Sequence, residues 1–161
     1  MKTTVYTTLL LILSLAFMGC PYESEVPITK PTTPIKKEYL GVWNSKDEVY
    51  HSYTVTEASP TEYRILQKNL LGETRQFKAH LSEIRGGVFL NLHCDSLNVY
   101  YLYRLQIDAP DKIVFIPIDP TIPEHYKNSE DLRHYVEKNM NLQSFYNAMD
   151  QILFERSPAK P

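Results

Sequence analysis

The chain has little cysteine: only Cys20 and Cys94 occur among its 161 residues. If Cys20 is modified, Cys94 has no partner within the chain, so a disulfide framework is excluded. An excess of charge of one sign is also lacking, because 17 basic and 19 acidic side chains give a formal net charge of −2. Without a basic cluster, binding to nucleic acid or to anionic lipid through charge is not expected.

Motifs of common enzyme classes are missing as well. The chain has no Gly-x-Ser-x-Gly turn and no glycine-rich loop that leads into a helix. His93 and Cys94 are neighbours, but adjacent residues of a strand point to opposite faces, so His93 cannot activate the thiol. We therefore expect Cys94 to be a buried free thiol, and we expect neither enzymatic activity nor a cofactor.

One pair of residues, His80 and His93, raises the question of a metal site. If the hairpin turn between them falls on residues 86–87, the two histidines face each other across neighbouring strands. A turn on residues 85–86 would pair His80 with Asn91 instead. Two histidines fall short of the three protein ligands of a catalytic zinc site. Two solvated histidines without a metal are therefore expected.

Residues 1–19 have the pattern of an export signal. Lys2 provides a positive charge near the start, residues 9–18 form an apolar run, and Gly19 follows. The run is too short to span a membrane, which takes about twenty residues. A buried core helix is disfavoured because Pro21 cannot continue a helix. The sequence therefore predicts export, and removal of Lys2 with the signal moves the formal net charge from −2 to −3.

The end of this segment, Phe17-Met18-Gly19-Cys20, resembles the lipobox of bacterial lipoproteins. The resemblance implies that Cys20 becomes the new N-terminus and carries acyl chains, palmitate among them. Two or more acyl chains give a stable membrane anchor. The expected location is the bacterial cell envelope, with the outer membrane favoured and its periplasmic and surface faces both left open.

Residues 20–37 are expected to form a tether between the lipid and the domain. Such a proline-rich stretch favours an extended chain of about 3.1 Å per residue, which would hold the domain up to about 50 Å from the membrane. Its prolines are Pro21, Pro27, Pro31 and Pro34. One folded domain is expected over residues 38–157, followed by a short tail over residues 158–161.

The body of the chain predicts a sheet. Short segments rich in Val, Ile, Tyr, Phe and Leu are separated by turn residues. The predicted strands cover residues 40–44, 49–56, 61–67, 74–84, 88–93, 98–107, 112–117 and 150–156. Apolar and polar residues alternate in several of them, and the connections are too short for crossover helices. The predicted fold is mainly β: an antiparallel eight-stranded meander that forms a closed or half-open barrel.

One outer face of this sheet needs a cover. Residues 113–116 are apolar on both faces, and the outward-facing Phe89 and Leu102 extend the apolar area. A helix that begins at Asn128 or Ser129 is expected to pack there, before the last strand. Its apolar stripe consists of Leu132, Tyr135, Val136 and Met140.

The first strand contains Gly41 and Trp43 in a Gly-x-Trp sequence. This tripeptide resembles the start of lipocalins and related calycin barrels, and the strand order over about 120 residues resembles theirs as well. The resemblance implies an antiparallel meander rolled into a barrel that often holds a small apolar ligand.

Inward positions of the predicted barrel are mostly bulky, so a filled core and a small cavity are both open. Four tyrosines are candidate ligand contacts, because their hydroxyls need partners or a wet pocket mouth: Tyr53, Tyr63, Tyr101 and Tyr103. We predict a membrane-anchored lipoprotein that binds a small apolar ligand or an envelope protein. The alternative is a structural or inhibitory protein-interaction module with a filled core.

Overall fold

The computed structural model describes residues 22–45 and 50–158. Within these ranges the strands are β1 (Glu23–Ser24), β2 (Gly41–Ser45), β3 (Tyr50–Ser59), β4 (Glu62–Asn69), β5 (Thr74–Ile84), β6 (Gly87–Cys94), β7 (Val99–Ala109), β8 (Lys112–Pro117) and β9 (Ile152–Arg156). The helices are α2 (Ser129–Asn139) and the short 3-10 turns η2 (Lys37–Tyr39), η3 (Gln143–Phe145) and η4 (Ala148–Asp150).

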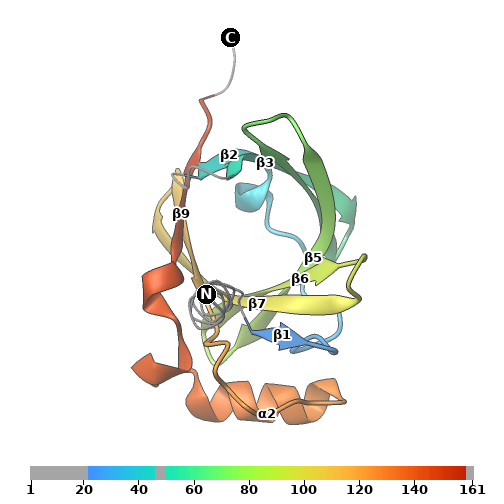
Figure 1. Ribbon diagram of the computed structural model, residues 1–161, viewed down its shortest axis with the longest axis vertical. Helices are drawn as coiled ribbons and strands as arrows, with labels where there is room; N and C mark the ends of the chain where they lie inside the picture. The colour runs from blue at the N-terminus through green and yellow to red at the C-terminus, as the bar shows by residue number, and fades with distance from the viewer. Residues whose placement is uncertain (1–21, 46–49, 159–161) are drawn as a thin grey trace, which may run out of the picture.

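Strands β2 to β9 form a closed antiparallel barrel. Each strand pairs with its neighbours in the chain, and the pairing of β2 with β9 closes the ring of eight (Figure 1). The short strand β1 lies outside the ring, where Glu23 is opposite Tyr101 of β7. The predicted eight-stranded antiparallel meander is therefore confirmed, with an additional strand on its outside.

The β5–β6 hairpin shows how the sequence sets the register. Its turn falls on Arg85 and Gly86, whose φ angles of 46° and 84° are both positive, as a tight two-residue hairpin requires. With this turn His80 lies opposite Asn91. Of the two registers that the sequence left open, this is the one in which the histidines do not face each other.

The predicted helix is confirmed as α2. The side chain of Asn128 caps its first turn by accepting a hydrogen bond from the Asp131 N–H at 2.9 Å. Leu132 and Val136 are buried and belong to one apolar cluster with Phe89 and Leu102 of the barrel wall. Figure 1 shows α2 outside the ring, beneath β7 and β1. The apolar outer face is thus covered by this helix and by one further segment.

That further segment is residues 22–30, here called the N-terminal strap. The side chains of Tyr22 and Ile28 are buried in the same cluster as Phe89. The Ile28 N–H also donates a hydrogen bond of 2.7 Å to Oδ1 of Asn91. The structure therefore corrects the predicted tether: residues 22–37 belong to the folded unit. The apolar side chains among the prolines bind this stretch to the wall, and extended backbone suits that contact.

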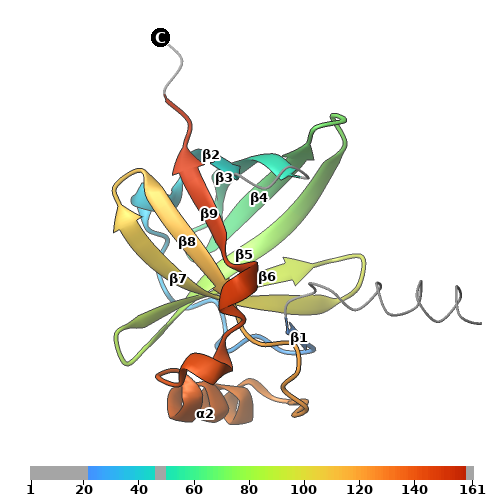
Figure 2. The ribbon, with the colours of Figure 1, turned by 60° about the vertical axis from the view of Figure 1, so that its left-hand side comes forward.

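The two ends of the barrel carry different turns. The β4–β5 and β6–β7 turns lie at one end, on the right in Figure 2, and the β5–β6 and β7–β8 turns lie at the other. The first end is called the mouth end. The second is called the plugged end, because residues 35–40 close it.

Candidate binding cavity

Residues 35–40 close the plugged end. The Ile35 N–H donates to the Pro60 carbonyl at 2.9 Å, and the Lys36 N–H donates to the Tyr63 hydroxyl at 2.6 Å. The chain then turns through η2, visible in light blue inside the ring of Figure 1, and buries Tyr39. Burial raises the pKa of Tyr63 to about 12, so its hydroxyl stays neutral.

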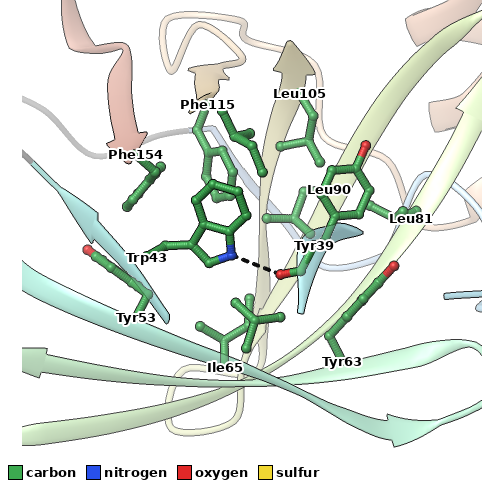
Figure 3. Close-up of a pocket in the computed structure, with 12 residues that line it drawn as sticks. Tyr39, Trp43, Tyr53, Tyr63, Ile65, Leu81, Leu90, Leu105, Phe115 and Phe154 are labelled. Carbon is green, nitrogen blue, oxygen red and sulfur yellow. Dashed lines mark hydrogen bonds between the residues drawn. The ribbon is translucent and has the colours of Figure 1, made fainter. Parts of the chain in front are cut away.

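Arg156, the last residue of β9, fixes this plug. Its guanidinium carbon lies 4.3 Å from the centre of the Trp43 ring, and its nitrogens donate to the carbonyls of Leu40, at 2.7 Å, and Glu38. The Trp43 indole N–H donates to the Tyr39 carbonyl at 2.9 Å (Figure 3).

Gly41 completes this arrangement. It has φ of 123°, and a Cβ atom there would lie 2.9 Å from Nη1 of Arg156. Gly41 therefore leaves room for the Arg156 guanidinium, and Trp43 stacks against it.

Above the plug lies an apolar cavity of about 50 Å³. Twelve residues, from all eight strands of the ring and from the plug, line it: Tyr39, Trp43, Tyr53, Val55, Tyr63, Ile65, Leu81, Leu90, Leu105, Ile113, Phe115 and Phe154. Figure 3 shows their side chains around the shared space. The cavity is about a third of one of roughly 150 Å³ that holds benzene, so most of the interior is filled by side chains.

The structure separates the four candidate tyrosines into two pairs. Tyr53 and Tyr63 line the cavity. Tyr101 and Tyr103 lie on the inner face of β7, as predicted from the alternation, but outside the lining. The Tyr53 hydroxyl accepts a hydrogen bond of 2.8 Å from the amide of Gln67, which is buried. This polar pair borders the otherwise apolar wall.

Several lining residues could not be predicted from the sequence. Tyr39 lies before the first strand, so alternation does not place it. Phe115 and Phe154 form an aromatic group with Tyr53. The ring centre of Phe154 lies 4.6 Å from that of Phe115 and 4.9 Å from that of Tyr53. Residues 113–116 are apolar on both faces, so the pattern could not say which side of β8 faces inward. For Arg156 the sequence offers one weak indication of a role, namely that a basic residue ends the final strand.

The mouth end is less tightly closed than the plugged end. Phe77, Leu92 and Tyr101 point inward near the β4–β5 and β6–β7 turns and are only half-buried. The inward-facing Tyr39 and Trp43 at the plugged end are buried. These three half-buried side chains are not among the residues that line the cavity, so they fill the part of the barrel between the cavity and the mouth end.

Apart from the tyrosines, the described ionisable side chains lie outside the lining of this cavity. Burial lowers the pKa of His80 on the outer wall, and its Nε2–H donates to the Thr29 carbonyl at 2.7 Å. His93 pairs with Asp95 at 2.8 Å, and the thiol of Cys94 is free and half-buried.

Two further findings concern metals and membranes. Among residues 22–45 and 50–158 no group of three or more His, Cys, Asp or Glu side chains is arranged to hold a metal ion. Within the same part of the chain, no helix has the length and apolarity needed to cross a membrane.

Comparisons with known proteins concern the fold. No protein-family model matches the chain, and no curated protein matches it. The crystal structure of a DUF4909 family protein from Staphylococcus aureus is similar, with a TM-score of 0.50 and 8% sequence identity. The similarity covers 76% of this chain and 100% of that protein. At this identity the likeness supports a shared β-barrel architecture.

Proposed function

We propose that the protein is an envelope lipoprotein, anchored through Cys20, whose lipocalin-like barrel binds a small apolar molecule. Cys20 lies outside the described residues, and the support for the anchor is the export signal and the lipobox resemblance. The support for binding is one observation: an apolar cavity inside a barrel that is plugged at one end and has only half-buried inward side chains near the other. No catalytic role is proposed, because the residues that line the cavity include no Asp, Glu, His, Cys, Lys or Arg.

The size of the cavity narrows the ligand class. Ligand pockets for drug-sized molecules have volumes of about 300–1,000 Å³, whereas this cavity has about 50 Å³. A ligand must therefore be slender, such as a single hydrocarbon chain. Because the cavity is smaller than such a chain, the half-buried Phe77, Leu92 and Tyr101 must move to admit it. The hydrogen-bonded pair of Tyr53 and Gln67 offers a hydroxyl and an amide to a polar group at one end of such a chain.

A pair of matched substitutions tests binding. Val55 lines the cavity, whereas Val42 on the neighbouring strand is exposed on the outer wall. We expect Val55→Phe to fill the cavity and to weaken binding of a fluorescent fatty acid about tenfold or more, while Val42→Phe leaves it unchanged. Titration of chain 20–161, with native mass spectrometry of the protein from its own host, provides the measurement. Equal affinities of the two variants would argue against the cavity as the site.

The two cysteines allow an equally direct test of the anchor. We expect Cys20→Ser to abolish incorporation of labelled palmitate and to release the protein from the membrane fraction, whereas Cys94→Ser retains both properties. Incorporation of label by the Cys20→Ser chain would contradict the proposed acylation site.

The second candidate function is a structural or inhibitory protein-interaction module of the envelope. The specific observation in its favour is that side chains already fill most of the interior, which leaves about 50 Å³. A host-purified protein that is folded, carries no bound mass and does not bind the fatty acid would support this alternative.

A further inference from the structure

Three leucines are exposed on turns of the mouth end. Leu70 and Leu71 of the β4–β5 turn are 55% and 86% exposed, and Leu97 of the β6–β7 turn is 60% exposed. Single exposed apolar residues are common, but these three lie on two separate turns at the same end of the barrel. Both turns appear on the right in Figure 2.

Both turns are well ordered by polar residues, so the leucines are not needed to form them. Asn69 Oδ1 accepts hydrogen bonds from the N–H groups of Leu71, at 3.0 Å, and Glu73, at 2.9 Å. In the β6–β7 turn, Asn98 has a positive φ of 54°, and its N–H donates to the Cys94 carbonyl at 2.8 Å. Each turn therefore presents its leucine side chains to the surroundings on a fixed backbone.

The described chain begins near the same end. Strand β1 pairs with the first residues of β7, next to the β6–β7 turn. The Tyr22 N–H donates at 3.2 Å to the carbonyl of Ile118, directly after β8 ends. Cys20 precedes Tyr22 by two residues, and two residues span at most about 7 Å. A membrane anchor at Cys20 is thus held close to this part of the barrel, because the strap replaces the long tether.

From these observations we infer that the mouth end docks on the lipid bilayer, with Leu70, Leu71 and Leu97 entering the boundary between headgroups and acyl chains. The inference rests on the proposed anchor at Cys20. The bilayer is the occupant that fits, because the anchor brings its surface within reach of this end and apolar side chains gain free energy on entering it.

Docking in this orientation has a consequence for the proposed ligand. The less tightly closed end of the barrel is the end that carries the three leucines, so it faces the membrane. An acyl chain then passes between the bilayer and the barrel without crossing bulk water, where exposed hydrocarbon is costly. This identifies the bilayer itself as the source of the slender apolar ligand.

The test supplies the anchor chemically. Chain 20–161 contains all the described elements, and with Cys94→Ser its one thiol, at Cys20, can be coupled to a maleimide phospholipid. The coupled protein is placed on vesicles of phosphatidylethanolamine and phosphatidylglycerol that contain brominated acyl chains, which quench tryptophan on contact. The variants Leu71→Trp, Leu97→Trp and Ile107→Trp are compared with the parent, whose native Trp43 is buried and gives the background.

Ile107 is the matched control, because it is 52% exposed but lies near the β7–β8 turn of the plugged end. Interfacial apolar groups lie about 5–10 Å into the headgroup and acyl boundary, so we expect the added fluorescence to fall about twofold at positions 71 and 97 and to stay unchanged at 107. Equal quenching at all three positions, or no quenching at 71 and 97, would overturn the inference. Failure of acylation at Cys20 in cells would refute the proposed anchor, and with it docking in the cell. The quenching experiment tests the orientation of the barrel separately, because the coupled lipid does not depend on acylation.

Discussion

Replacement of Arg156 by methionine is expected to lower the free energy of unfolding by about 3 kcal/mol. The guanidinium lies 4.3 Å from the Trp43 ring centre and donates to the carbonyls of Leu40 and Glu38. Methionine retains much of the apolar volume but removes the charge and all donors. The two carbonyls lose their partner, and the segment that plugs the barrel loses its attachment to β9.

Denaturant unfolding measures this effect, with Trp43 as the reporter because it is the single tryptophan of the chain. Arg64→Met serves as the control, because Arg64 is exposed on the outer face of β4. We expect Arg64→Met to change stability by less than about 0.5 kcal/mol. A similarly small change for Arg156→Met would show that the plug is held by Tyr39 and Ile35 without the arginine.

Local patterns were sufficient to predict most of the barrel. Alternation in residues 74–84 and 98–107 places one face of each strand inside, because side chains of a strand point to opposite faces in turn. The helix was equally predictable from the sequence, because Asn128 supplies a cap and Leu132 and Val136 share one face. These features depend on residues that are close in sequence, and the structure confirms them.

Contacts between distant parts of the chain were not predictable in the same way. The prolines of residues 21–34 favour extended backbone, which suits a free tether and a strap on the wall equally well. Ile28 meets Asn91, which follows it by 63 residues, and Arg156 reaches Leu40 over 116 residues. No local sequence pattern identifies partners that lie so far apart in the chain. The size of the cavity could not be predicted for the same reason, because it depends on how rings such as Tyr39 and Phe154 pack together.

The strap provides the second prediction with a large expected effect, the replacement of Asn91 by leucine. Asn91 is completely buried; its Oδ1 accepts from the Ile28 N–H at 2.7 Å, and its Nδ2 donates to Ser82 Oγ at 2.8 Å. Leucine has a similar shape but leaves the buried Ile28 N–H without its acceptor. We therefore expect a loss of about 3 kcal/mol, with amide exchange of residues 22–30 accelerated more than that of β5 and β6.

Asn44→Leu, on an exposed position of β2, should leave the exchange of the strap unchanged. Uniform acceleration across the barrel in Asn91→Leu would mean that the strap does not open on its own. The strap also links stability to the proposed docking. Once released, residues 20–34 would extend over about 45 Å, so the lipid would no longer hold the mouth end against the bilayer. Quenching at position 71 should then fall in the Asn91→Leu background even though the chemical anchor is intact.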